Sequence, residues 1–287
     1  MKTLSVVLAT RNEESNIAAC LSSVKDIVNE IIVFDEYSTD DTQKIAKSFG
    51  AIVHSVQHED IFHVTKQKAI SAAGCDWILQ LDADEIVSIE LAQEIQEVLS
   101  MSDEEIKRRR PESSRQWNLF KRHQHVVEAR DGKLGKKTNE VVAFFIPRRN
   151  LFIGEPLIHA GVYPDGVIRL VKRNKAYLPA KSVHEQMVIE GEVAWLFSDL
   201  IHNDSPTLTK YLKRMNRYTD LRAADLKVMQ IPKNITQLFV ATFLSLPSQF
   251  ALRYLRRRGY KDGIRGFLWA LLSAWQYPLA YYKYYFN

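Results

Sequence analysis

Cysteine is scarce in this chain of 287 residues: only Cys20 and Cys75 occur, and they show no paired spacing. Neither a disulfide framework nor a structural zinc site is therefore expected, and a reducing, cytoplasmic compartment fits. A signal peptide is not expected either, because the apolar stretch from Leu4 to Leu8 is too short for its core and no cleavage site follows. We interpret that stretch as the first strand. No internal repeat is evident.

Charge is unevenly distributed along a chain of ordinary globular composition, 46% hydrophobic and 25% charged. Residues 206–287 contain 14 Lys and Arg against three Asp, a net +11, whereas the whole chain carries +5, so residues 1–205 carry −6. The basic part is also rich in tryptophan and tyrosine. This combination indicates an anionic surface as a partner, with membrane and nucleic acid as the candidates.

Strand-like and helix-like segments alternate over the first hundred residues. Apolar runs at 4–9, 30–35, 51–56 and 77–82 are separated by helical patterns at 14–24, 41–49 and 65–73, and another helix is expected at 89–99. Such alternation predicts an α/β fold in which helices cover both faces of a parallel sheet, and ligands bind beyond the carboxyl ends of its strands. A later β region, at 141–154 and 165–174, is expected to complete the sheet.

Two later regions differ in character from this alternating part. Residues 102–140 are charged or rich in Gly and Lys, and we expect exposed loops there around a short strand pair. Near Pro206 the pattern becomes helical, so we predict a catalytic domain at 1–205 and a basic, aromatic-rich helical tail at 206–287. The last apolar stretch is interrupted by Gln276, Pro278 and Lys283 and ends in tyrosines, which favours lying in a membrane interface over spanning it. Helices that cover one another as a soluble cap are the alternative.

The acidic segment "LDADE" follows the fourth predicted strand directly. Asp82 and Asp84 are one residue apart, so at a strand end both can present oxygen ligands to one site, which would suit Mg²⁺ or Mn²⁺. An ion there would neutralise a diphosphate and stabilise its departing oxygen. The alternative is a solvated turn whose acids cap the next helix.

Two further polar clusters follow predicted strands. In "DEYSTDDT" the Ser, Thr and later Asp residues can cap a helix, while Asp35 stays free to accept a hydrogen bond from the imide N–H of uracil. In "TRNEE", Asn12 or Ser15 can cap a helix, while Arg11 and Glu13 are available to a nucleotide. Both clusters are therefore compatible with nucleotide binding or with capping alone.

Taken together, the three clusters resemble the motifs of family 2 glycosyltransferases, which have the GT-A (Rossmann-like) fold. "TRNE", "DEYSTDDT" and "DADE" correspond in order to the T-x-N-E, "DDGSTDGT" and "DADD" motifs of that family. Glu36 and Tyr37 depart from the usual Asp and Gly, which makes nucleotide-sugar binding a firmer expectation than uridine specificity. We predict donor contacts from Thr10, Arg11, Asn12, Glu13, Asp35, Tyr37, Lys66, Gln67, Asp82, Ala83 and Asp84. For Lys66 and Gln67 a place on a surface helix is the alternative.

The later half resembles the lipopolysaccharide core glycosyltransferases that add glucose or heptose, through "RLVKRNKAYLPAKSVHEQM", "LIHND" and the aromatic tail. That resemblance implies an inverting enzyme that uses a nucleotide-diphosphate sugar, UDP-glucose by analogy, and a lipid-linked saccharide acceptor. Inversion requires a base at the acceptor hydroxyl, and Glu185 is our first choice. His184 and His202 are candidate metal ligands beside Asp82 and Asp84, or phosphate contacts, or structural histidines.

Three functions remain open on these residues. The first is a metal-dependent glycosyltransferase, peripheral or monotopic at the cytoplasmic face of the inner membrane. The second passes the sugar to a polyprenyl phosphate, and the third is a non-catalytic, membrane-bound nucleotide-sugar binding protein. The basic runs at 107–110 and 256–258 carry no nucleic-acid-binding signature, so anionic lipid or a phosphorylated sugar is the expected partner, not nucleic acid.

Overall fold

The computed structural model describes residues 2–179 and 186–286. The chain divides into two compact units, whose boundaries fall inside strands β6 and β12. Unit 1 contains residues 1–148 and 164–202, and unit 2 contains residues 149–163 and 203–287. The sequence assigns residues 149–163 to the catalytic part, whereas in the structure they belong with the helical tail.

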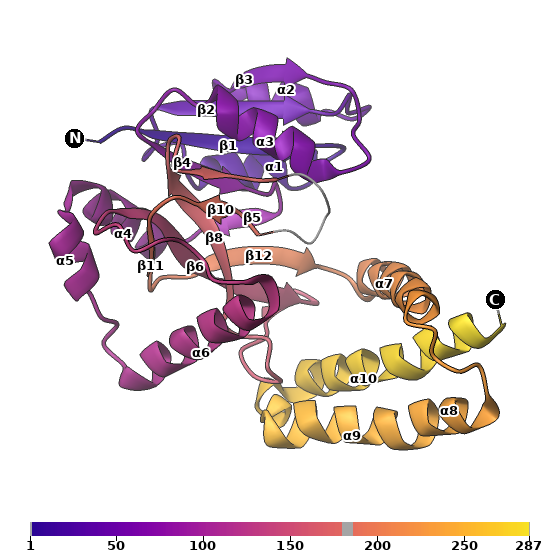
Figure 1. The fold of residues 1–287 in the computed structure, drawn as a ribbon. Helices are drawn as coiled ribbons and strands as arrows, with labels where there is room; N and C mark the ends of the chain where they lie inside the picture. The colour runs from indigo at the N-terminus through magenta and orange to yellow at the C-terminus, as the bar shows by residue number, and fades with distance from the viewer. Residues whose placement is uncertain (1, 180–185, 287) are drawn as a thin grey trace. The chain divides into compact units, whose positions relative to one another are not determined.

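One mixed β-sheet organises the first unit, with strand order β3-β2-β1-β4-β8-β6-β12-β5 (Figure 1). β1 (Leu4–Thr10), β2 (Glu30–Asp35), β3 (Ile52–Ser55) and β4 (Trp77–Leu81) run parallel. β8 (Asp165–Lys172) is antiparallel to β4 and to β6 (Val141–Phe152), and β12 (Leu200–Ser205) is antiparallel to β5 (Glu85–Val87). Short strands β7 (Glu155–Pro156) and β11 (Glu192–Trp195) pair with β6, while β9 (Ala176–Tyr177) and β10 (Val188–Ile189) pair with each other.

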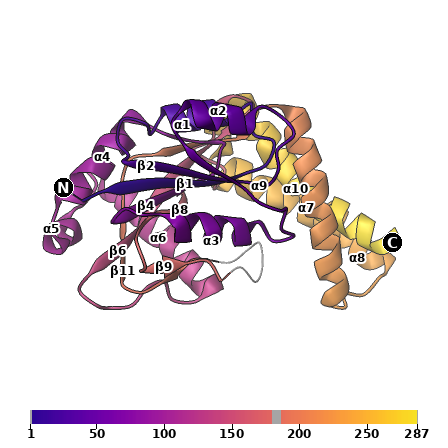
Figure 2. The same cartoon turned by 90° about the horizontal axis from the view of Figure 1, so that it is seen from above.

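Helices cover both faces of the parallel strands, as the sequence predicts. The four are α1 (Ile17–Ser22), α2 (Thr42–Ser48), α3 (Phe62–Ala72) and α4 (Ile89–Ser100). In Figure 2, α1 and α2 lie along one side of β1 and β2, and α3 lies along the other. Every residue of β1 is buried, which is typical of a strand covered on both faces. The predicted α/β mixed sheet flanked by helices is therefore confirmed.

The prediction of loops at 102–140 is wrong, because two helices form there: α5 (Asp103–Arg108) and α6 (Ser114–Asp131). Ser102 and Glu105 form a capping box, and the Ser113 hydroxyl caps α6. α6 buries Phe120, whose ring stacks on Trp195 at 4.6 Å between centroids. A few buried apolar side chains are enough to pack α6 against the rest of unit 1, although the charged composition of this segment indicated a loop.

The second unit consists mainly of helices, as the pattern of the tail predicts. α7 (Leu208–Val228) and α10 (Gly263–Phe286) pack together, and α8 (Ile235–Phe239), η1 (Val240–Ser245), α9 (Leu246–Ala251) and η2 (Leu252–Arg256) form one continuous helical stretch, followed by η3 (Gly259–Asp262). The wider π-helical turn of η1 precedes Pro247, whose ring would clash with a carbonyl of a regular α-helix. The 149–163 segment is tied to these helices, since His159 Nδ1 lies 2.7 Å from an Asp262 carboxylate oxygen.

The apolar helix of unit 2 that is most exposed is residues 235–256, not the last helix. By length and composition alone it is apolar enough to cross a membrane, a test that core helices of soluble proteins also pass. Its side chains at Ile235, Phe239 and Phe243 are all more than half exposed. α10 instead buries residues along its length, including Ala270, Ala274 and Tyr281. The predicted interfacial role of the last stretch stays a prediction.

Candidate active site

The three polar clusters meet at one edge of the sheet, because they follow the parallel strands β1, β2 and β4. Thr10 pairs with Asp35 in the register of β1 and β2, and Leu8 pairs with Leu81 in that of β1 and β4. The carboxyl ends of adjacent parallel strands therefore bring residues 10–14, 35–41 and 82–85 together. The three segments therefore lie together at one edge of the sheet, and their part in one binding site stays a prediction.

Asp35 is fully buried and holds this edge together. One carboxylate oxygen accepts hydrogen bonds from Thr10 Oγ1 (2.9 Å) and Ser38 Oγ (2.6 Å), and the other from the Ser38 amide (2.8 Å) and Gln43 Nε2 (2.6 Å). Four donors match the lone-pair sites that a carboxylate offers. In this arrangement Asp35 fixes the loop after β2, and its contact with a uracil base stays a prediction.

The two loops after β1 and β2 are also joined through Asn12. Its backbone N–H donates to Ser38 Oγ at 2.8 Å, and its side-chain oxygen accepts from the Thr39 amide at 2.9 Å. Asn12 and Tyr37 both have positive φ, 55° and 48°. That conformation favours Gly, the residue usual in the family at the position of Tyr37, and it leaves the Tyr37 side chain 61% exposed.

The remaining residues predicted on these loops differ in exposure and in their contacts. Arg11 is exposed, whereas Glu13 is partly buried and accepts a hydrogen bond from Asn16 Nδ2 at 2.7 Å. Glu36, the other departure from the family motif, is buried and contacts Thr65 Oγ1 (2.5 Å) and His58 Nδ1 (2.6 Å). Glu36 thus connects the loop after β2 to α3.

Asp82 lies between two cations of the chain itself. Lys66 Nζ from α3 is 2.5 Å from one carboxylate oxygen, and an Arg169 nitrogen from β8 is 2.5 Å from the other. Burial raises the pKa of Asp82, but Arg169 and Lys66 outweigh it and hold that pKa well below its usual range. Both oxygens are therefore occupied by charged partners, and a part for Asp82 in metal binding stays a prediction.

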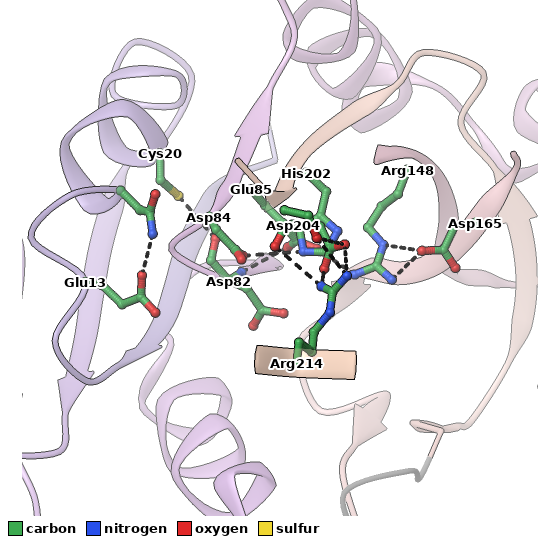
Figure 3. A network of polar contacts seen from close by, with 12 residues as sticks. Glu13, Cys20, Asp82, Asp84, Glu85, Arg148, Asp165, His202, Asp204 and Arg214 are labelled. Atoms are coloured by element: carbon green, nitrogen blue, oxygen red, sulfur yellow. Dashed lines mark hydrogen bonds and ion pairs between the residues drawn. The ribbon is translucent and has the colours of Figure 1, made fainter. Parts of the chain in front are cut away.

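Glu85 belongs to the same network of ion pairs as Asp82. It is fully buried, it accepts a hydrogen bond from the Asp82 amide at 2.9 Å, and its other oxygen lies 2.8 Å from Arg169 and 3.3 Å from Arg148. Figure 3 shows Glu85 between the other two acids and Arg148, which also binds Asp165 at 2.6 Å. Asp82 and Glu85 are thus neutralised by arginine and lysine side chains, which offsets part of the repulsion that the acidic sequence implies.

Cys20 of α1 approaches the same segment from the other side (Figure 3). The thiol is fully buried and donates to the Asp82 carbonyl at 3.6 Å. Burial raises its pKa well above the ordinary value, and the charges of Glu85, Asp82 and Asp84 raise it further. Cys20 is therefore a neutral packing residue at this site, not a nucleophile.

Asp84 is paired with a different residue, His202 of β12. His202 Nε2 lies 3.6 Å from a carboxylate oxygen of Asp84, because the antiparallel pairing of β12 with β5 sets His202 opposite Glu85. A carboxylate and an imidazole form a donor pair that suits Mn²⁺ and other first-row divalent ions, so these two residues fit the predicted metal. Within the described residues no group of three or more His, Cys, Asp or Glu could hold an ion, so further ligands would come from a bound diphosphate and water.

A cavity of about 490 Å³ adjoins the Asp82 network. Lys66, Arg148 and Arg169 line it, together with Leu178, Gln186 and Met187. Gln67 of α3 accepts a hydrogen bond from the Leu178 amide at 2.6 Å, so it supports the wall of this cavity. Ala83 is buried within the acidic turn. The predicted base Glu185 and the predicted ligand His184 lie outside the described residues.

Arg148 and Arg169 are the site residues that the sequence reasoning missed. Both belong to β-strands that are otherwise largely apolar, "VVAFFIPRRNLF" and "DGVIRLVK". An arginine inside a buried strand needs an anionic partner, because an unpaired buried charge is costly. That rule, applied to Arg169, would have pointed to the acids at the end of β4.

The mixed sheet, with a polar and partly acidic edge at the carboxyl ends of its parallel strands, defines an α/β protein. Residues 5–161 match the family model described as "Glycosyl transferase family 2", which covers more than half of the chain. The chain belongs to that family, and it is a glycosyltransferase.

Some relatives of this chain match only part of its length, and another matches nearly all of it. An uncharacterized glycosyltransferase of Rickettsia typhi is 40% identical over 107 residues, which is 37% of this chain and 36% of that protein. The chain thus matches about a third of the length of the rickettsial relatives. Lipopolysaccharide core biosynthesis glycosyltransferase LpsC of Rhizobium meliloti is 24% identical over 277 residues, 94% of this chain and 87% of LpsC.

Solved structures give a weaker likeness. Glucosyl-3-phosphoglycerate synthase of Mycobacterium tuberculosis, in complex with Mn²⁺, UDP and glucosyl-3-phosphoglycerate, matches 80% of this chain and 81% of that chain, with 17% identity and a TM-score of 0.42. Its complex with Mn²⁺, UDP-glucose and phosphoglyceric acid matches 36% of this chain and 41% of that chain at 28% identity, with a TM-score of 0.31. The ligands in these complexes are bound to the mycobacterial enzyme.

Proposed function

We propose that this glycosyltransferase moves glucose from UDP-glucose to a hydroxyl of a lipid-linked saccharide such as the inner core of lipopolysaccharide, with inversion at the anomeric carbon. The nearly full-length similarity to LpsC supports the acceptor class. The observation that carries the proposal is the contact of Asp84 with His202, 3.6 Å apart at the end of β4, where "DADE" corresponds to the "DADD" motif of family 2 enzymes.

Asp84 and His202 are the protein ligands of a divalent ion, Mn²⁺ or Mg²⁺, in this proposal. Such an ion, when bound, neutralises the diphosphate and stabilises the oxygen that leaves the sugar. Lys66 and Arg169 hold Asp82 by contacts of 2.5 Å each, which fixes the backbone of the turn that carries Asp84. The loop of Asn12, Asp35 and Tyr37 lies at the same sheet edge and is proposed to receive the nucleoside, with the exposed Tyr37 ring available for stacking on the base.

Glu185 is the proposed general base. It would take the proton of the acceptor hydroxyl as that oxygen attacks the anomeric carbon from the side opposite the diphosphate, and UDP would leave. Leu178, Gln186 and Met187, which precede and follow residues 180–185 in the sequence, line the cavity beside the Asp82 network. Four basic side chains, Lys66, Arg130, Arg148 and Arg169, line the same cavity.

Membrane attachment is proposed through unit 2, at the cytoplasmic face of the inner membrane. Its exposed apolar helix 235–256 ends in a run of arginines at 256–258, and residues 206–287 carry a net +11. An exposed apolar surface next to positive charge is complementary to an anionic lipid surface. The attachment is proposed to be peripheral or monotopic.

A thermal-shift panel tests the donor. UDP-, GDP- and ADP-glucose would each be added with and without Mn²⁺, because a ligand that binds only the native state raises the melting temperature. The proposal expects the largest shift for UDP-glucose, and only with Mn²⁺. A larger shift with another nucleotide sugar would overturn the assignment of UDP.

Substitution of the base distinguishes a saccharide acceptor from a polyprenyl phosphate. Glu185→Gln should abolish UDP release that depends on a saccharide acceptor, because a hydroxyl must lose its proton, whereas a phosphate acceptor is already ionised and needs no base. Glu190→Gln is a matched control, since Glu190 is exposed and the change in charge is the same. Full activity of Glu185→Gln would remove Glu185 from the mechanism and favour the phosphate acceptor.

A further inference from the structure

A second cavity, of about 300 Å³, lies entirely within unit 2. It is formed by the turn at residues 160–162, by α7, by the end of the apolar helical stretch and by α10. Three arginines line it: Arg222, Arg253 and Arg257. The glycosyl-transfer chemistry described above uses none of them.

Two of these arginines converge on one aromatic ring. The guanidinium carbon of Arg222 lies 4.1 Å from the centroid of the Tyr277 ring, and that of Arg253 lies 5.8 Å from it. Burial raises the pKa of Tyr277, but hydrogen bonding and charge from Arg253, together with Arg222, lower it below the ordinary value. Arg253 also donates to Gln249 at 2.6 Å, which fixes its position. The two positive groups are therefore held near each other although they repel.

The third arginine packs against a glycine in the wall of the cavity. A Cβ atom at Gly161 would come within 2.4 Å of a terminal nitrogen of Arg257, and the φ of Gly161 is +81°. The Arg257 carbonyl in turn accepts a hydrogen bond from the Ala160 amide at 3.0 Å. The positive φ favours glycine at this position, and the missing Cβ leaves room for the Arg257 side chain.

The residues that line the cavity, all of them among the described residues, include no Asp or Glu. The other lining groups are small, amide, hydroxyl or aromatic, and include the buried hydroxyl residue Ser273. Guanidinium groups match the geometry of phosphate oxygens through paired N–H donors. Arg253 and Arg257 also lie at or just beyond the end of the exposed apolar helix 235–256, where a lipid headgroup would be positioned.

We propose that this arginine cavity is a binding site for a phosphomonoester group, carried either by a lipid headgroup or by a soluble sugar phosphate. Arg222 and Arg253, which both lie against the Tyr277 ring, bind the phosphate oxygens, and Arg257 lines the same cavity. The proposal stands on unit 2 alone and does not depend on the donor or acceptor of glycosyl transfer.

The test compares two double variants of the full chain that remove the same charge. Arg222→Gln with Arg253→Gln changes the cavity, and Lys213→Gln with Arg217→Gln changes two exposed residues of α7 that do not line it. Binding is measured by calorimetry with inorganic phosphate and glucose 1-phosphate, and by flotation with phosphatidylcholine vesicles that contain phosphatidic acid. Vesicles that contain phosphatidylglycerol, a phosphodiester, at equal surface charge serve as the control. They measure the electrostatic attraction of the chain to an anionic membrane that has no phosphomonoester.

The cavity variant should bind phosphate or phosphatidic acid vesicles about tenfold more weakly than the native chain, while the control variant stays close to native. Binding of the soluble phosphates identifies a sugar phosphate as the ligand, and a response to phosphatidic acid vesicles alone identifies a headgroup. Equal losses in both variants, or no binding of any phosphomonoester by the native chain, would overturn the site. Should the double variant unfold, Arg222→Gln alone carries the test, because Arg222 is exposed.

Discussion

His202 and Asp84 lie 3.6 Å apart although they are far apart in the sequence and belong to the two different chain segments of unit 1. The pairing of β12 with β5 creates this contact at the mouth of β4. Asp84 therefore has a histidine as its partner, a residue type that also binds metals. Asp82 and Glu85 instead form ion pairs with basic side chains, those of Lys66, Arg148 and Arg169. The acids of one short segment thus have different partners: Asp82 and Glu85 contact lysine and arginine side chains, and Asp84 contacts His202.

Arg169 should be essential for stability. It lies between Asp82 and Glu85 and is 8% exposed, so Arg169→Met leaves both carboxylates without their main partner. Loss of one member of a buried ion pair costs about 3–5 kcal/mol in the free energy of unfolding. Urea denaturation measures it, with Lys68→Met as the control, because the exposed pair of Lys68 with Glu59 should contribute less than about 1 kcal/mol. Equal destabilisation by the two changes would contradict this account.

The pH dependence of stability should reveal the charge of Asp82. Its folded-state pKa is well below the ordinary value, so its contribution is fully present above the unfolded pKa of about 4 and is lost as pH falls through the folded value. Asp82→Asn should therefore be less stable than the native chain at pH 7, and the difference should shrink progressively below about pH 4. Urea titrations at a series of pH values measure this. A difference that stays constant down to the lowest pH would rule out an ionised, stabilising Asp82.

Tyr37 is expected to contribute to nucleotide binding and to cost stability. Its φ of 48° is a conformation that side chains with a Cβ rarely adopt, and its ring is 61% exposed. Tyr37→Gly relieves the backbone strain but removes a stacking surface worth about 1–3 kcal/mol per base. We expect weaker UDP binding by calorimetry together with an unchanged or higher melting temperature. UDP affinity equal to that of the native chain would exclude stacking by Tyr37.

The exposed helix of unit 2 should mediate attachment to vesicles. Phe239→Asp with Phe243→Asp places two charges on its exposed face and should reduce flotation with anionic vesicles about tenfold or more. Val228→Asp with Met229→Asp is the matched control, since both residues are exposed but lie outside the helix. If both pairs of changes reduce binding to the same degree, the effect is one of net charge and the helix is not the attachment surface.

The parallel half of the fold was predictable because its strands and helices leave clear patterns in short windows. Apolar runs followed directly by polar residues, as in β4 and the Asp82 turn, indicate both the strand and the site edge. The partners Arg148, Arg169 and His202 were not placed by such patterns, since their contacts depend on long-range pairing of β6, β8 and β12. Helix α6 was missed for a related reason: its few buried residues, such as Phe120, find their partner Trp195 far along the chain.

The most direct test of the account is the binding of Mn²⁺ in the presence of UDP, followed by electron paramagnetic resonance of the free ion. The native chain should bind Mn²⁺ weakly alone and markedly more tightly with UDP, because Asp84 and His202 supply only part of the coordination shell. Asp84→Asn and His202→Gln should each weaken that UDP-dependent binding by about tenfold or more, whereas Asp41→Asn, a change at an exposed acid, should not. Unchanged UDP-dependent binding of Mn²⁺ in both site variants would contradict the central claim that these two residues hold the ion.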